Sequence, residues 1–138
     1  MLIVDSGPIV AVLNRNDPDH KRCAELLESH DGELLITPYV LTEACYLLAK
    51  YVGPDAEINL IEAVAAEDLV QAPTARDDLS RIAELMQQYR GFPLGVADAS
   101  VCADFRICPH GHAASAVQLG KQCTLGPHLS INRGISHG

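Results

Sequence analysis

Met1-Leu-Ile-Val-Asp-Ser-Gly-Pro8 is the stretch of sequence from which we predict the fold. Four apolar residues are followed at once by a carboxylate, a hydroxyl, a glycine and a proline. This pattern is typical of a short strand that is buried on both faces and ends in a turn. In open α/β sheets, ligands bind at the carboxyl ends of the strands. Asp5 is therefore a candidate catalytic residue, although an acid in this place can also be a helix cap or a solvated loop residue.

The length and composition of the chain predict one globular domain. The chain has 138 residues, of which 48% are hydrophobic, and it has no low-complexity tract. No apolar run approaches the roughly 20 residues of a membrane span, and the N-terminus does not resemble a signal peptide. Five cysteines without framework spacing fit a reducing compartment. We therefore expect a cytoplasmic protein without a membrane partner.

The charge of the chain is acidic and unevenly spread. The net charge of −8 argues against a protein that binds nucleic acid through bulk positive charge, so metal ions or a partner would have to offset the repulsion. All 18 acids lie within residues 1–104, whereas residues 105–138 hold three of the ten Lys/Arg and four of the six histidines. We treat residues 1–138 as a single domain whose part 102–138 is atypical.

Periodicity and turn residues predict an alternation of strands and helices, which is typical of an α/β fold with a parallel sheet. After the first strand, an apolar segment over 9–13 resembles a helix. Thr37 and Pro38 are a strong helix start, as N-cap and first helical residue. The other predicted elements are a helix over 20–29 capped by Asp19, a strand over 33–36, helices over 38–53 and 54–66, a strand over 69–72, and a helix capped by Thr74 with Asp77 as its third residue.

Two further acids stand in informative places. Glu43 lies within the apolar stripe of the helix that starts at Pro38, so it is either a boundary residue that reaches solvent or an acid that points inward. Asp98 follows a glycine-rich approach and lies in the first turn of a new helix, where the helix dipole favours a carboxylate. By itself, Asp98 is a common kind of first-turn acid.

Taken together, Asp5, Glu43 and Asp98 could converge at the carboxyl edge of the sheet. A cluster of like charges would need a bound cation, and oxygen-only ligands favour Mg²⁺, with Mn²⁺ as the alternative. Carboxylate sites that hold such ions activate water and neutralise phosphate. Phosphodiester hydrolysis is therefore the reaction class that these residues suggest.

Three motifs in this order and spacing resemble the leading motifs of PIN-domain proteins, in particular VapC-type toxins. They are Ile3-Val-Asp-Ser6, Thr37-Pro-Tyr-Val-Leu-Thr-Glu43 and Gly95-Val-Ala-Asp-Ala99, and the likeness covers residues 1 to about 101. The resemblance implies an α/β/α sandwich around a short parallel sheet and a Mg²⁺-dependent endoribonuclease. It also implies a homodimer that a VapB-type antitoxin neutralises.

The resemblance also implies a role for each matching residue. Asp5 and Asp98 would be metal ligands and catalytic residues. Glu43 would be a catalytic acid oriented toward metal or water. Ser6 would be a substrate-binding or site-holding hydroxyl.

The chain departs from the family after residue 101. The family has a further strand about 15 to 20 residues after the third motif, which ends in a threonine-rich turn with a fourth acid. Here residues 113–118 read Ala-Ala-Ser-Ala-Val-Gln, the late segment Thr124–Leu129 resembles that turn only faintly, and no acid follows Asp104. We therefore expect the last strands to be altered or missing. Strand one would then be unpaired along one edge, unless residues 117–125 pair with it or the tail is disordered.

Two explanations of residues 102–138 stay open. One is a natural divergent terminus, in which His110 or His112 replaces the lost acid. The other is a reading-frame shift near Val101, which the abrupt loss of acids and of hydrophobic periodicity favours. Cysteines and histidines in this part are zinc-ligand types, but Cys108-Pro-His-Gly-His112 lacks the spacing of structural zinc sites.

The residues leave three functions open. The first is a metal-dependent ribonuclease toxin. The second is a catalytically degenerate protein that only binds antitoxin or dimerises, because a missing fourth acid would weaken metal binding. The third is a small metal phosphatase that uses the same acids.

Overall fold

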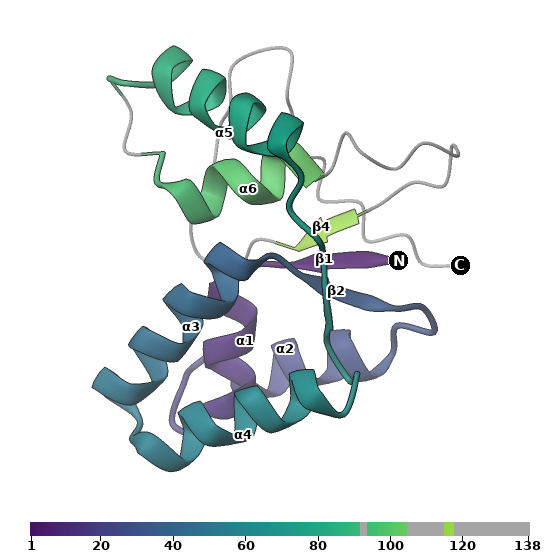
Figure 1. Ribbon diagram of the computed structural model, residues 1–138. Coiled ribbons are helices and arrows are strands. Elements are labelled where there is room, and N and C mark those ends of the chain that lie inside the picture. The colour runs from purple at the N-terminus through teal and green to yellow at the C-terminus, as the bar shows by residue number, and fades with distance from the viewer. Residues whose placement is uncertain (92–93, 105–114, 118–138) are drawn as a thin grey trace.

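The computed structural model describes residues 1–91, 94–104 and 115–117 of the chain. Strands and helices alternate from the N-terminus, as predicted (Figure 1). The elements are β1 (Leu2–Val4), α1 (Ser6–Leu13), α2 (His20–Glu28), β2 (Leu34–Ile36), α3 (Pro38–Tyr51), α4 (Pro54–Ala65), β3 (Val70–Gln71), α5 (Arg76–Gln88), α6 (Val96–Asp104) and β4 (Ser115–Val117).

The strands form one parallel sheet in the order β3-β2-β1-β4. β1 is an inner strand, with Ile3 opposite Leu35 of β2 on one side and Ala116 of β4 on the other. All three residues of β1 are buried. The prediction that the first strand is buried on both faces is therefore confirmed.

The helices cover both faces of this sheet. Figure 1 shows α1, α2, α3 and α4 on one side of the strands and α5 with α6 on the other. A parallel sheet needs cover on both faces, because its apolar side chains point alternately to the two sides. The predicted α/β/α sandwich around a short parallel sheet is confirmed.

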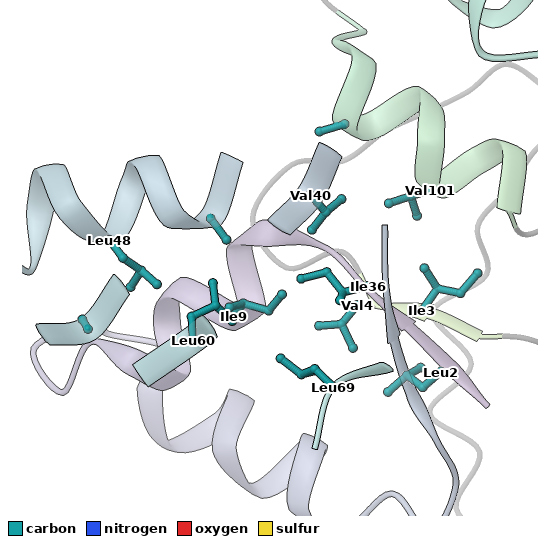
Figure 2. Packing of buried hydrophobic residues seen from close by; sticks show 13 residues of the cluster. Leu2, Ile3, Val4, Ile9, Ile36, Val40, Leu48, Leu60, Leu69 and Val101 are labelled. Atoms are coloured by element: carbon teal, nitrogen blue, oxygen red, sulfur yellow. The ribbon is translucent and has the colours of Figure 1, made fainter. Parts of the chain in front are cut away.

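The main core joins the inner strands to α3, α4 and α6. Val4, Ile36 and Val40 are fully buried and lie close together, and Val101 of α6 points toward them (Figure 2). Leu48 of α3 and Leu60 of α4 close the other end of the cluster. The same core therefore holds the starts of α3 and α6 beside the sheet.

Local signals predicted some helix ends and missed others. Thr37 caps α3 as expected, because its hydroxyl accepts the Val40 N–H at 3.2 Å. Asp19 precedes α2 but makes no side-chain cap bond. The expected start of α5 at Thr74 is wrong by one residue. Ala75 is the N-cap, and its N–H is bound at 2.6 Å by the carboxylate of Asp78 rather than of Asp77.

β1 is paired along the edge that altered last strands could have left open, because β4, over residues 115–117 rather than 117–125, lies beside it. The backbone of Ser115–Val117 runs parallel to β1, with Leu2 opposite Ser115 and Val4 opposite Val117. This strand falls within the Ala-Ala-Ser-Ala-Val-Gln segment, in which Val117 is the one strong strand former. His110, His112, Cys108, Cys123 and the Thr124–Leu129 segment lie outside the described residues.

Two further findings concern the thiols and the helices. Cys23 and Cys45 are free thiols, and burial raises the pKa of both thiols above the usual value. None of the described helices is long and apolar enough to cross a membrane.

Candidate active site

Asp5 follows β1 directly and begins α1. Its Oδ1 accepts the Ser6 N–H at 2.8 Å, and its side chain is largely buried, with 9% of the residue exposed. The cap interpretation of Asp5 is therefore correct, and the residue also stands at the carboxyl edge of the sheet. These two roles are compatible, because a helix N-terminus stabilises the ionised carboxylate.

Ser6 connects Asp5 to the second predicted acid. The Ser6 hydroxyl donates to Glu43 Oε2 at 2.6 Å, across 37 residues of sequence. A hydroxyl bound to a carboxylate at this distance makes a short, charge-assisted hydrogen bond. Ser6 therefore bridges the two acids, with its backbone N–H on Asp5 and its side chain on Glu43.

Glu43 combines the two alternatives that its sequence position left open. The residue is exposed to solvent, so it is not buried inside the apolar stripe of α3. The buried residues of that stripe are Val40, Ala44 and Leu48. Its carboxylate nevertheless turns toward the end of β1 and bonds to Ser6. Glu43 is thus a boundary residue that is aimed at the candidate site.

Asp98 lies in the first turn of α6, as predicted, and is half-buried. Its Oδ2 is 3.4 Å from the backbone nitrogen of Gly95, which places the carboxylate near the N-terminus of the helix. α6 packs against α3, and so does α1. The helices that begin with Asp98 and Ser6 therefore share α3 as a common neighbour.

A buried contact joins α3 to α6 and was not foreseen from sequence. The hydroxyl oxygens of Thr37 and Ser100 are 2.7 Å apart, and the two residues are 1% and 2% exposed. Ser100 also donates to the carbonyl oxygen of Ala97 at 2.6 Å. The only sequence signal for this contact was the Ser100 hydroxyl among the apolar residues Ala97, Ala99 and Val101.

The candidate site residues carry oxygen ligands that suit a divalent cation, but they are few. No group of three or more His, Cys, Asp or Glu side chains among residues 1–91, 94–104 and 115–117 could hold a metal ion. The donors near the strand end are carboxylate and hydroxyl oxygens, which are the kind that Mg²⁺ prefers. Mg²⁺ keeps several water ligands and is often held by one or two carboxylates. Asp5 and Asp98 are therefore ligands of the kind that such an ion prefers.

A hollow on the surface lies away from Asp5 and is acidic, so it does not suit the hydrolysis of a phosphodiester. It has a volume of about 500 Å³ and lies at the amino ends of β2 and β3, away from the edge that carries Asp5. Its lining includes Asp31, Glu33, Glu67 and Asp68. Four acids would repel a nucleic acid, so we do not assign the site there.

Comparison with known proteins agrees with this architecture. The model of the PIN domain family matches residues 2–103. Ribonuclease VapC26 of Mycobacterium tuberculosis is 29% identical over 99 residues, which cover 72% of this chain and 73% of the relative. The crystal structure of M. tuberculosis VapC20, described as a sarcin–ricin loop cleaving toxin, is 20% identical. It superposes with a TM-score of 0.72 over 77% of this chain and 82% of that one.

The matched region contains every element that carries a candidate site residue. Asp5, Ser6, Glu43 and Asp98 all lie within residues 2–103, and β4 lies beyond them. Because the family model covers most of the chain and the fold agrees with it, the chain belongs to the PIN-domain family.

Proposed function

We propose that this chain is a VapC-type toxin, an endoribonuclease that hydrolyses RNA phosphodiester bonds with the help of Mg²⁺, or of Mn²⁺ in its place. The observation that carries the proposal is the Asp5–Ser6–Glu43 network at the carboxyl end of β1. The resemblance to a protein named as a VapC ribonuclease supports the same reaction.

We assign a role to each residue of the network and to Asp98. Asp5 and Asp98 would hold the metal ion, which when bound supplies positive charge to the scissile phosphate and lowers the pKa of a water molecule. Glu43 would accept a proton or orient water from the solvent side, because the residue is exposed and its carboxylate is held by Ser6. Ser6 would hold Glu43 in place rather than react itself.

The acidity of the chain supports a need for cations and a partner. At a net charge of −8 the protein repels RNA at long range, so substrate binding would depend on bound metal to offset the carboxylates. We further propose that the protein acts in the cytoplasm as a homodimer and that a VapB-type antitoxin is its partner. These proposals rest on the resemblance to VapC proteins.

A second candidate function is a degenerate PIN domain that only binds antitoxin or dimerises. Two observations favour it. The described residues hold no group of three metal-ligating side chains, and no acid follows Asp104 in the sequence. Such a protein would bind its partner and cleave no RNA.

Cleavage of RNA by an Asp5→Asn variant tests the proposed function. The amide keeps an oxygen that can accept the Ser6 N–H, so the α1 cap survives, whereas the negative charge is lost. We expect cleavage to fall at least roughly 100-fold and Mg²⁺ binding by calorimetry to be lost. Asp68→Asn is the matched control, because Asp68 is an exposed acid of the acidic hollow.

The outcomes separate the two candidate functions. Cleavage and Mg²⁺ binding by the parent and by Asp68→Asn, both lost in Asp5→Asn, would support the nuclease. A parent that binds antitoxin but neither binds Mg²⁺ nor cleaves RNA would support the binding-only protein. Equal activity in all three proteins would point to a contaminating nuclease and overturn the assignment of Asp5.

A further inference from the structure

We propose that Thr37 and Ser100, named here the hydroxyl pair, are positioning residues that fix the rotation and height of α6 and thereby place Asp98 in the site. The inference rests on the proposed function, because it assigns these residues a purpose in metal binding. Neither residue touches the reacting atoms in this account. Their effect passes through the helix that carries Asp98.

The direction of each hydrogen bond in the pair follows from counting protons. A hydroxyl has one proton to donate, and Ser100 gives its proton to the carbonyl oxygen of Ala97. Thr37 must therefore donate to Ser100 across the 2.7 Å contact. The Thr37 oxygen in turn accepts the Val40 N–H. Both buried hydroxyls therefore donate and accept one hydrogen bond each, and these bonds form a continuous series from α3 to α6.

The apolar side chains through which α6 packs are mostly small. The helix is buried between the main core, which Ala97 and Val101 contact, and the α5 side, which Ala99 and Ala103 contact. Three of these four side chains are single methyl groups, which interdigitate weakly with their neighbours. A directional hydrogen bond between buried groups adds a constraint on the rotation of the helix, because this bond is lost when the helix turns or slides.

The position of Ser100 relative to Asp98 makes this constraint useful. The two residues are two apart, so their side chains are about 200° apart around the helix and about 3 Å apart along it. The hydroxyl pair therefore lies on one side of α6, and the Asp98 carboxylate lies on the opposite side. A turn of one residue, about 100°, would carry Asp98 away from its place. Thr37 is also the N-cap of α3, the helix that carries Glu43. The hydroxyl pair therefore connects the helix of Glu43 to the helix of Asp98.

The experiment compares Ser100→Ala with a conservative and a matched variant. Ser100→Ala removes the acceptor for Thr37 but leaves the Thr37 cap on α3 intact. Thr37→Ser is the conservative variant, because it keeps both the cap and the hydroxyl donor. Cys23→Ala is the matched control, because it removes one polar atom from an equally buried site on α2. Should Ser100→Ala fail to fold, Ser100→Cys, a weaker hydrogen-bonding group of similar shape, takes its place.

Two measurements are made on each folded protein, well below its melting temperature. Calorimetry gives the Mg²⁺ dissociation constant, and amide hydrogen exchange of the metal-free protein gives the protection of the Ala99 N–H, which bonds to Gly95 in the first turn of α6. We expect Ser100→Ala to weaken Mg²⁺ binding roughly 10-fold and to speed exchange at Ala99. Thr37→Ser and Cys23→Ala should match the parent in both.

Three outcomes would count against the proposal or against its basis. Unchanged Mg²⁺ affinity in a folded Ser100→Ala protein overturns the positioning role. An equal loss in Cys23→Ala also overturns it, because the effect would then be general destabilisation. A parent that binds no Mg²⁺ overturns the proposed metal site instead, and exchange at Ala99 still decides whether the hydroxyl pair fixes α6.

Discussion

At the scale of single residues, the site depends on side chains that each perform two tasks. Asp5 caps α1 and stands at the strand end, and Ser6 uses its backbone on one acid and its hydroxyl on another. Thr37 begins α3 and reaches α6. Such sharing makes the acids mutually dependent, because moving one group changes the hydrogen bonds of the next.

Replacing Ser6 with alanine tests this dependence. The backbone N–H still binds Asp5, so α1 keeps its cap, but Glu43 loses its 2.6 Å partner. A hydrogen bond to a charged group contributes about 1.5–3 kcal/mol, so we expect RNA cleavage to fall at least roughly 10-fold. Steady-state cleavage kinetics check this, with Ser80→Ala as the exposed control. Full activity in Ser6→Ala would mean that Glu43 needs no support from this hydroxyl.

At the scale of elements, the helices differ sharply in what holds them. α3 has an N-cap, a proline at its first position and a fully buried stripe. α6 has nine residues and packs largely through alanines, and its Ser100 is hydrogen-bonded to Thr37 of α3. α4 is held by Leu60, which is fully buried in the main core. Stability and site geometry therefore depend on different elements.

The contribution of α4 can be measured with neighbouring residues. Leu60→Ala leaves a cavity in the core and should lower the free energy of unfolding by about 2–5 kcal/mol. Ile61→Ala on the same helix should change it by less than about 0.5 kcal/mol, because Ile61 is 48% exposed. Urea unfolding followed by circular dichroism gives both values. Similar losses in the two variants would indicate that the exposed face of α4 is covered in solution.

Local chemistry allowed much of the fold and part of the site to be predicted. The Thr37-Pro38 start was correct because a cap and a proline act within one helical turn. Asp5 and Asp98 were placed correctly because the end of a strand and the first turn of a helix can be read from adjacent residues.

The parts that were missed depend on distant partners. Ser100 could not be matched to Thr37, because 63 residues separate them and either hydroxyl could have faced solvent. The direction of the Glu43 side chain could not be predicted from the apolar residues around it. Its carboxylate points toward the Ser6 hydroxyl, which is 37 residues away in the sequence. The position of β4 was not foreseen, because its pairing depends on the distant strand β1 and only Val117 of its three residues is a strong strand former.

At the scale of the whole molecule, the sheet joins the first strand of the chain to the last described strand. β4 comes after the family match ends at residue 103, yet it pairs with β1, the strand that carries Asp5 at its end. β1 is therefore flanked on both sides, and its backbone is protected from pairing with another molecule. β4, which lies beyond the residues that match the family, thus supports the strand that carries Asp5.

Substitution at Ala116 tests the contribution of β4 to the molecule. Proline there removes a backbone donor and should disrupt the pairing opposite Ile3, whereas valine suits a strand. We expect Ala116→Pro to lower the melting temperature and to increase aggregation on heating, and Ala116→Val to leave both unchanged or improved. Light scattering during a thermal melt measures both properties. Equal behaviour of the two variants would show that β1 does not need this partner.

The cap that Asp5 forms on α1 affects how the chain could change over evolutionary time. If the proposed hydrolysis were lost in a descendant, replacing this residue with one that has no side-chain acceptor would still lower helix stability by about 0.5–2 kcal/mol. Aspartate, asparagine or serine would therefore persist at position 5 in inactive descendants. Retention of the acid alone cannot identify a working enzyme, whereas its exchange for asparagine marks a protein that kept the fold and gave up the charge.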